Sequence, residues 1–426
     1  MASYVTRLQC VNCGAEYPLD SQMFQGCPTC KTEDFASSLS PDYDYGRLSK
    51  CVTRDYFARR PKRAGIWRYE ELLPVREDAH RITLSEGSTP LVRCDRWATE
   101  LGLKACYIKD EGRNPTWSFK DRHAAVSVSI AVQQGAKAVT IATSGNHGAA
   151  TAAYAAKAGL SAFIFTYPGY YQTMRTLIQI YGGYLFCTSV EGRWVLMGEG
   201  IKRYGWYPIG NLTTLPTCNP VGHDGYKTIA YEICEDLRWQ PPDFVIVPSG
   251  FSEGLYGIWK GFRELKLLSL IDRTPRMIST EPAAGGPLAV AIATGERIVR
   301  LAGGWSHQTV ARGIAVSTNS YLGVLAVSES GGVALTVPDE DTLAAQKQMA
   351  REGVYAECTA ATAGAGLNKL ATTVDLQGAV AVVVNSSCGI KDFALIVADM
   401  PEPPTVEPDF GAFEKAAAQV YGASFS

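Results

Sequence analysis

Short apolar runs alternate with longer stretches of small residues through the chain, and this alternation restricts the fold more than any other feature. Strands are predicted at 103–109, 138–143 and 161–166, and the residues that follow the first two runs have the alanine-rich composition of buried helices. Two further apolar runs, 244–247 and 379–384, are typical of strands buried on both faces. Strands that alternate with helices at this spacing predict a parallel sheet with helices on both faces, which is an α/β fold.

The loops that follow three of these strands carry the polar residues of a candidate site, because ligands of parallel sheets bind at the carboxyl ends of the strands. The loops are 143–148 (TSGNHG), 248–254 (PSGFSEG) and 385–392 (NSSCGIKD). The first two enter predicted helices, whose free N–H groups and positive dipole end favour an anion such as phosphate. Each loop by itself is equally typical of an ordinary strand-end turn, and a carboxylate at Glu253 would repel a phosphate unless it points away.

Lys120 is the candidate for covalent chemistry. It lies in 115–122 (PTWSFKDR), between a predicted strand and a helix that starts near Asp121. A lysine amine is inert while protonated and becomes reactive when it is desolvated or joined to a carbonyl as an imine. A single lysine at such a place is most often solvated. The three loops that accompany Lys120 favour a catalytic role instead.

Four cysteines near the start of the chain predict a structural zinc site. Cys10-x-x-Cys13 and Cys27-x-x-Cys30 are separated by thirteen residues, a spacing that suits four thiolates around one tetrahedral ion. Because so short a segment cannot bury a core of its own, metal would supply its stability; the alternative is an appendage that once bound metal. The following segment, 42–75, is interpreted as a linker whose basic run 59–63 is solvated.

Composition excludes several classes of function. The formal net charge is −2, and 46% of the residues are hydrophobic, so a large core is expected and nothing recruits nucleic acid or an anionic membrane. No apolar run is long enough to span a bilayer, and the first residues lack the apolar core of a secretory signal. The eight remaining cysteines are scattered, as reduced cytosolic thiols would be. We expect a cytoplasmic protein without nucleic-acid or membrane partners.

Taken in order, five segments resemble the fold type II family of pyridoxal-phosphate enzymes, and within it the threonine synthase branch. The segments are 86–91 (EGSTPL), 109–122 (KDEGRNPTWSFKDR), 143–148, 309–315 (TVARGIA) and 386–392. The paired cysteines also match many threonine synthases. The resemblance implies a fold like the tryptophan synthase β subunit and a homodimer. Its parts would be a zinc-ribbon-like segment (1–40), a linker or extension (41–85), a larger lobe (86–135 and 216–426) and a smaller lobe with the asparagine loop (136–215).

The resemblance also implies roles for individual residues. Lys120 would carry pyridoxal 5'-phosphate, Asn146 would bond its ring oxygen, and Ser386 would bond its ring nitrogen. The cofactor phosphate would be held by Gly250, Phe251, Ser252, Glu253 and Gly254. The substrate would be bound by Lys109, Thr116, Ser118, Ser144, Gly145 and His147, with the last three supplying N–H groups to its α-carboxylate. Arg122 and Arg312 are further candidates, with Lys109, for a second anionic group.

The activity that the resemblance implies is elimination or replacement at the β or γ carbon of an amino acid, with Lys120 as general base. O-Phosphohomoserine is the first candidate substrate. Three departures from the branch indicate a different substrate: Trp117 stands where threonine synthases usually have Gly, the loop ends Gly-Asn-His-Gly instead of Gly-Asn-Thr-Ser, and Phe251 and Glu253 stand where Asn is common. The alternatives are a serine/threonine dehydratase or diaminopropionate-type ammonia-lyase, and a zinc-ribbon binding protein with an inactive core.

Overall fold

The computed structural model describes residues 3–143, 145–169, 172–302, 308–393 and 400–425. The chain divides into two units, Met1–Gly389 and Ile390–Ser426. The second unit contains helix α15 (Phe410–Tyr421), whose N-terminus is capped by the Asp409 carboxylate, which accepts a hydrogen bond from the Ala412 N–H. The first unit contains the three sheets and the candidate site.

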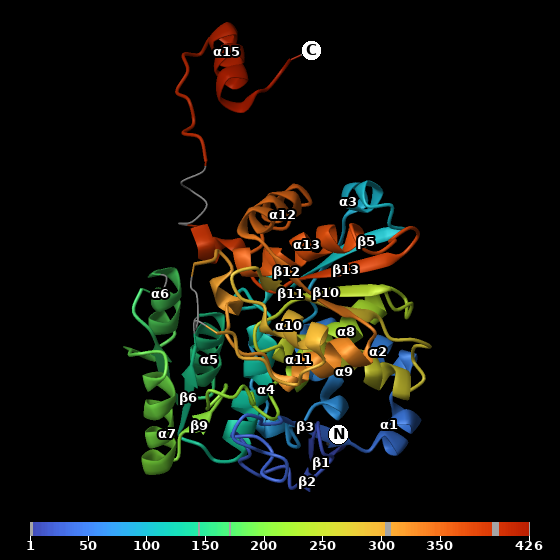
Figure 1. Ribbon diagram of the computed structural model, residues 1–426, viewed down its shortest axis with the longest axis vertical. Helices are drawn as coiled ribbons and strands as arrows, with labels where there is room; N and C mark the ends of the chain where they lie inside the picture. The colour runs from blue at the N-terminus through green and yellow to red at the C-terminus, as the bar shows by residue number, and fades with distance from the viewer. Residues whose placement is uncertain (1–2, 144, 170–171, 303–307, 394–399, 426) are drawn as a thin grey trace. The chain divides into compact units, whose positions relative to one another are not determined.

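The larger parallel sheet has six strands in the order β12-β11-β10-β13-β5-β4. All neighbouring pairs are parallel except β4 and β5. Strand β13 has a nearly continuous apolar sequence because helices cover both faces of the sheet. Figure 1 shows these two layers, with α3, α12 and α13 on one side of the sheet and α8 to α11 on the other. The strands are β4 (Leu91–Arg93), β5 (Ala105–Asp110), β10 (Phe244–Pro248), β11 (Arg276–Pro282), β12 (Val333–Val337) and β13 (Val380–Asn385).

A second sheet has four parallel strands in the order β8-β7-β6-β9. Its strands are β6 (Ala138–Ala142), β7 (Ser161–Thr166), β8 (Tyr184–Cys187) and β9 (Tyr207–Pro208). The two sheets confirm the predicted α/β class. The smaller sheet takes its strands from 138–208, and the larger sheet takes its strands from the residues before and after that range. The exact lobe boundaries stay a prediction.

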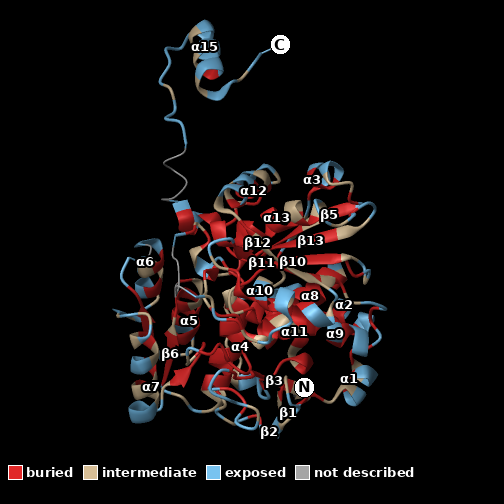
Figure 2. Cartoon of the chain, viewed as in Figure 1, coloured by how far each residue is buried: buried red, intermediate tan, exposed pale blue. Residues whose placement is uncertain are grey.

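The helices around the sheets are rich in small residues where they pack closely, and Figure 2 shows that the strands and the helix faces against them are buried. Helix α4 packs against α5 and α8, and α8 packs against α9. The α-helices of the first unit are α1 (Tyr45–Cys51), α2 (Arg54–Arg59), α3 (Asp95–Glu100), α4 (Lys120–Gln133), α5 (Asn146–Lys157), α6 (Gln172–Ile180), α7 (Gly192–Tyr204), α8 (Asp224–Asp236), α9 (Glu253–Leu267), α10 (Pro287–Thr294), α11 (Tyr321–Glu329), α12 (Asp339–Arg351) and α13 (Cys358–Ala371). Short 3₁₀ helices are η1 (Lys62–Leu72), η2 (Asp78–His80), η3 (Glu111–Arg113), η4 (Arg312–Ile314) and η5 (Gly389–Asp392).

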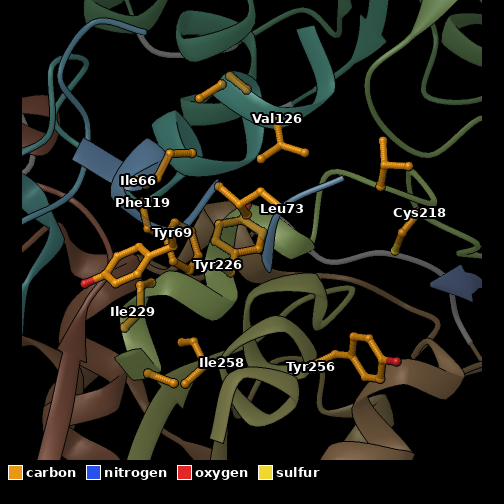
Figure 3. Close-up of a cluster of buried hydrophobic side chains, with 14 of the residues drawn as sticks. Ile66, Tyr69, Leu73, Phe119, Val126, Cys218, Tyr226, Ile229, Tyr256 and Ile258 are labelled. Atoms are coloured by element: carbon orange, nitrogen blue, oxygen red, sulfur yellow. The ribbon is translucent and has the colours of Figure 1, made fainter. Parts of the chain in front are cut away.

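The segment 42–75 is part of the core, so its interpretation as a solvated linker was wrong. Phe57, Ile66, Tyr69 and Leu73 are fully buried, and Figure 3 shows the last three in one cluster with side chains of α4, α8 and α9. The basic run itself is mostly exposed, as expected. The sequence misled because α1, α2 and the turns of η1 bury apolar side chains without a regular helical or strand period.

The N-terminal segment forms a three-stranded antiparallel sheet in the order β2-β1-β3, made of β1 (Val5–Cys10), β2 (Glu16–Tyr17) and β3 (Leu39–Tyr43). Its last strand is tied to the helices below the larger sheet. The Ser40 hydroxyl lies 2.9 Å from both His223 Nε2 and Lys260 Nζ, and the Tyr43 hydroxyl donates to Asp224 at 2.5 Å. The segment therefore shares its packing with α8 and α9.

None of the helices in the described parts of the chain has the length and apolar character to cross a membrane.

Candidate active site

The predicted site residues gather at one edge of the larger sheet. Strands β10, β13 and β5 are parallel neighbours, so the residues that follow them meet at the carboxyl edge. Lys120 follows β5 as the first residue of α4, and the Phe119 N–H donates to the Ser386 carbonyl at 2.9 Å. Ser118 and Ser387 form an antiparallel bridge. The structure thus places the reactive lysine beside the loop that follows β13.

Lys120 lies in an apolar, aromatic environment that suits a neutral amine. Its Nζ is 4.9 Å from the ring centroid of Phe119 and 5.5 Å from that of Tyr226, and both rings belong to the buried cluster (Figure 3). Burial lowers the pKa of the Lys120 amine, and the charge of Glu253 opposes this shift. A larger neutral fraction is what both imine formation and proton abstraction require.

The second predicted loop ends at the N-terminus of α9, which has the form of an anion site. The N-cap residue, Ser252, has φ +61° and makes no side-chain capping bond, so no cap side chain occupies the first N–H groups of this 15-residue helix. A Cβ on Gly254 would lie 2.7 Å from Cε2 of Phe119, so only glycine allows this close approach. The loop also lies against η4, because a Cβ on Gly250 would be 3.3 Å from Cα of Ile314. These features fit a bound phosphate.

Glu253, which the sequence made an awkward member of this loop, has its charge balanced elsewhere. Its Oε1 accepts a hydrogen bond from the Asn219 N–H at 3.3 Å and lies 3.5 Å from His123 Nε2. Burial acts to raise the pKa of Glu253, but His123, and then Lys120 and His147, hold it below its usual range. These partners balance the charge of the Glu253 carboxylate, so the repulsion of a bound phosphate that the sequence predicted is reduced.

The asparagine loop also reaches this edge. Helix α5 begins at Asn146 after Gly145, which has φ +153° and provides no side-chain cap, so a second helix N-terminus is open to an anion. The Asn146 amide donates to Glu357 Oε2 at 2.7 Å and accepts from the Ser387 hydroxyl at 3.4 Å. The His147 Nε2 lies 3.1 Å from His123 Nδ1. Ser144, also predicted here, lies outside the described residues.

Two serine hydroxyls at the site are available to a ligand. Ser386 is buried, and its side chain makes no hydrogen bond to any described residue. The Ser118 hydroxyl is buried without a hydrogen-bond partner in the described chain. Thr116 differs, because its hydroxyl donates to Asp121 at 2.9 Å and so braces the first turn of α4. A buried hydroxyl without a partner is unusual in folded proteins, and a ligand at this edge of the sheet would give Ser118 one.

Lys109 and Arg122 need correction as candidates for a second substrate anion. Both are fully buried in an ion cluster that sequence reasoning missed, and its carboxylates are Glu111 and Glu232. Arg122 lies 2.6 Å from Glu111 and 2.7 Å from Glu232, and Lys109 lies 2.8 Å from Glu232. The four charges neutralise one another and join β5, α4 and α8 beneath the site. Arg312, which opens η4 beside the Gly250 loop, stays a candidate.

The pairs of cysteines meet in one cluster, as predicted. Their four Sγ atoms lie within 4.8 Å of one another, with Cys10 and Cys30 3.7 Å apart and Cys13 and Cys27 also 3.7 Å apart. Two thiolates on a tetrahedral zinc ion with bonds of about 2.3 Å lie about 3.8 Å apart, whereas disulfide sulfurs lie about 2.0 Å apart. The donor set and its spacing are compatible with a metal ion.

A desolvated lysine, two open helix N-termini and an unpaired hydroxyl at the edge of a parallel sheet define an enzyme that binds a phosphorylated carbonyl cofactor. Comparison with known proteins leads to the same class of enzyme. Residues 82–387 match the family described as "Pyridoxal-phosphate dependent enzyme", and the chain belongs to this family.

The curated relatives place the chain in one branch of the family. It is 33% identical to the threonine synthases of Methanocaldococcus jannaschii and Methanosarcina acetivorans, over 96% of this chain and 98% of each relative. Among solved structures, maize serine racemase superposes with a TM-score of 0.63 at 20% identity, over 82% of this chain and 97% of that one. O-Ureido-L-serine synthase superposes with a TM-score of 0.60 at 24% identity, over 74% of this chain and 94% of that one. The predictions of a fold type II enzyme and of a threonine synthase-like lyase are confirmed.

Proposed function

We propose that the enzyme replaces or eliminates a phosphate leaving group on an O-phosphorylated amino acid, with O-phosphohomoserine as the first candidate. The observation that carries this proposal is the position of a desolvated Lys120 close to the open N-termini of α9 and α5. One terminus suits the cofactor phosphate and the other suits the substrate carboxylate. The threonine synthase relatives over 96% of the chain support the same reaction class.

The residues present fit pyridoxal phosphate, which would supply an electron sink for the reacting amino acid. Lys120 would hold it covalently, the N–H groups from Gly250 to Gly254 would bind its phosphate, and the Ser386 hydroxyl would face its ring nitrogen. A hydroxyl does not require a protonated ring nitrogen, which favours expulsion of a leaving group over transamination. Asn146 would reach the ring oxygen from its place beside Glu357 and Ser387.

Substrate binding would use the other half of the site. The backbone N–H groups at the start of α5, from Gly145 to His147, would orient the α-carboxylate, and Ser118 and Thr116 would line the approach to Lys120. Lys120, which is neutral in its apolar surroundings, would be the base that removes the Cα proton. Its aromatic neighbours exclude water from this step.

A substrate screen tests the proposal. Purified protein loaded with pyridoxal phosphate is offered O-phosphohomoserine, O-phosphoserine, serine and threonine, and the release of phosphate, ammonia and new amino acids is measured. We expect phosphate with a new amino acid from a phosphorylated substrate. Ammonia and a keto acid from serine or threonine, without turnover of either phosphorylated compound, would establish the ammonia-lyase alternative.

That alternative has one structural observation in its favour, which is Trp117. Its backbone adopts φ +61°, a conformation that suits glycine, and its side chain is 39% exposed immediately before the Ser118–Phe119 pair that precedes Lys120. The zinc-ribbon alternative with an inactive core predicts a damaged lysine or loop. Lys120 and the glycines of both loops are intact.

Substitution Trp117→Gly is expected to raise kcat/KM for O-phosphohomoserine about tenfold or more relative to O-phosphoserine. Removal of the ring enlarges the pocket for a longer substrate, and a difference of one methylene changes selectivity by about 10–200-fold. The ratio of the two kcat/KM values is the measurement. Trp194→Gly, in α7, serves as the control and should leave the ratio unchanged. An unchanged ratio in Trp117→Gly would show that this ring does not select the substrate.

We also propose that the cysteine cluster holds a structural zinc ion. Purified protein should contain about one zinc per chain by elemental mass spectrometry, and Cys27→Ser should lose the metal and lower the melting temperature because the ion stabilises its segment. Cys187→Ser, an exposed cysteine outside the cluster, should change neither quantity. Full stability of the chelated protein would contradict a structural role.

We further propose that two 46.0 kDa chains form a homodimer and that the enzyme acts in the cytoplasm on a small amino acid, without nucleic-acid or membrane partners. Family resemblance supports the dimer, and the scattered positions of the cysteines outside the cluster support a reducing compartment. Light scattering after size-exclusion chromatography measures the assembly directly.

A further inference from the structure

Three titratable side chains that have no side-chain role in the chemistry described so far form a buried chain beside Lys120. Glu253 Oε1 lies 3.5 Å from His123 Nε2, and His123 Nδ1 lies 3.1 Å from His147 Nε2. The residues come from three different helices, α9, α4 and α5. The two imidazole rings are nearly perpendicular, at 83°, with centroids 4.4 Å apart. Such a line of hydrogen-bonding groups has the parts of a proton relay.

The fold is built to hold the central histidine in place. His123 is fully buried, and a Cβ on Gly222 would lie 2.2 Å from both its Cε1 and its Nε2, so only glycine at that position leaves room for the ring. The Ser127 hydroxyl is 3.3 Å from His123 Nδ1 but donates to the His123 carbonyl at 2.8 Å. The ring nitrogen thus remains an acceptor for His147.

The partners determine which nitrogen atoms carry hydrogen. A carboxylate is an acceptor, so His123 presents N–H at Nε2 to Glu253 and a lone pair at Nδ1. His147 must then donate from Nε2, which leaves a lone pair on its own Nδ1. In the protein without substrate, His123 Nε2 makes no hydrogen bond to a described residue, and Glu253 Oε1 lies 3.5 Å from it; catalytic hydrogen bonds often form fully only when substrate is bound.

The three side chains of the relay lie close enough to Lys120 to act in the same reaction. His123 is three residues after Lys120 on α4, and His147 follows the asparagine of the α5 loop. Burial, and then the charges of His123 and Lys120, lower the pKa of His147, so its imidazole is neutral and can accept a proton at neutral pH. The same neighbourhood places Glu253 within the electrostatic reach of Lys120.

The other titratable groups near Glu253, His123 and His147 cannot take over their role. Burial lowers the pKa of His223 to about 4, and its nitrogen atoms are engaged by Ser40 at 2.9 Å and the Asn219 carbonyl at 3.3 Å. Burial raises the pKa of the Cys218 thiol and of the Tyr226 hydroxyl. Neither group accepts a proton near pH 7. Asp224 and Lys260, which act on His223, pair with each other at 2.6 Å.

A replacement reaction requires a second base, because Lys120 holds the Cα proton while the incoming nucleophile adds. We propose that His147, with His123 and Glu253 behind it, accepts the proton of that nucleophile, a protic X–H compound such as water. This inference rests on the proposed replacement chemistry. A simple ammonia-releasing elimination has no incoming nucleophile and needs no such base. His147 is then a catalytic residue, and His123 and Glu253 position it.

The step balances without an oxidant or reductant. The bond from X to the substrate carbon forms as X–H breaks, and the proton goes to Nδ1 of His147. The proton on His147 Nε2 then passes to His123 Nδ1, and the positive charge rests on His123 beside the Glu253 carboxylate, which balances it. The proton returns by the same route to solvent or to the departed phosphate.

The test separates nucleophile addition from the chemistry of Lys120. In His147→Gln and His123→Gln, replacement should slow at least about 100-fold, the usual range for loss of a general base. In His123→Gln, whose residue has no part in binding the substrate, exchange of the substrate Cα hydrogen in D₂O, measured by mass spectrometry, should stay within about threefold of the wild-type rate. His80→Gln, at a half-buried position in η2, is the control and should change neither rate. Unchanged replacement, or exchange lost in step with replacement, would overturn the relay.

A second measurement does not depend on turnover. The chain has five histidines, so ¹⁵N-histidine NMR can assign tautomers in protein without substrate. We expect His123 and His147 both to carry hydrogen on Nε2. If the wild-type enzyme performs no replacement, the proposed function fails, and this spectrum still tests the relay: hydrogen on Nδ1 of either ring overturns it.

Discussion

Lys120→Ala is expected to abolish turnover, with a loss of about a thousandfold or more. The substitution removes both the covalent attachment of the cofactor and the base that takes the Cα proton, and a general base alone contributes about 10²–10⁴-fold. The protein should also lose the visible absorption of the lysine-bound cofactor, and borohydride should add no cofactor mass to the chain. Activity, absorbance and intact mass are the three measurements.

Lys104→Ala is the matched control for this experiment. Lys104 is exposed immediately before β5, in the same strand–helix unit as Lys120. Its substitution should leave turnover, absorbance and borohydride labelling at wild-type levels. Cofactor mass retained in Lys120→Ala would mean that another lysine carries the cofactor, and the assignment of Lys120 would be wrong.

Arg122→Met is expected to destabilise the fold by about 3–5 kcal/mol, the usual effect of removing one partner of a buried ion pair. Glu111 and Glu232 would be left as buried carboxylates with Lys109 as the one remaining cation of the cluster. Denaturation by urea, followed by circular dichroism, measures the change. Arg113→Met removes an exposed arginine paired with Asp110 and should change stability by about 1 kcal/mol or less.

The loss of stability caused by Arg122→Met should depend on pH in one direction. Burial acts to raise the pKa of Glu232, but Arg122 and Lys109 hold it below its usual range. A carboxylate with a lowered folded pKa contributes stability that is present above its unfolded pKa of about 4.3 and is lost as the pH falls through the folded value. The gap between wild type and Arg122→Met should therefore be widest above about pH 5 and narrow only as the pH falls below about 4. A gap that widens on acidification would contradict the cluster.

Local signals in the sequence were sufficient for much of the fold. The apolar run before Asn385 predicted a central strand because it has no polar side, and the structure has β13 at Val380–Asn385. Lys120 was placed at a helix start by the change from Pro and Ser to small residues, and α4 begins at that residue. The helix N-termini at the candidate anion sites follow from the same strand–glycine–helix pattern.

The contacts that sequence could not predict join residues far apart in the chain. Lys109 and Arg122 have charges that suit a substrate anion, but Glu232 reaches them from a helix more than a hundred residues later and neutralises both. Glu253 was assigned to phosphate binding on its position alone, since nothing near it in sequence indicated His123. Partners of this kind are fixed by tertiary packing, and a single sequence gives no local sign of them.

The link between β3 and the helices behind the site has a consequence for the cell. Ser40 bonds His223 and Lys260, and Tyr43 bonds Asp224, so the strand that follows the four-thiol cluster is part of the support of α8 and α9. Failure of the cluster to form would loosen that support and, with it, α9, whose first turn is the proposed site of the cofactor phosphate. On the proposal that the cluster holds zinc, scarcity of that metal would then limit how much of this enzyme reaches its working form, even when vitamin B6 is abundant.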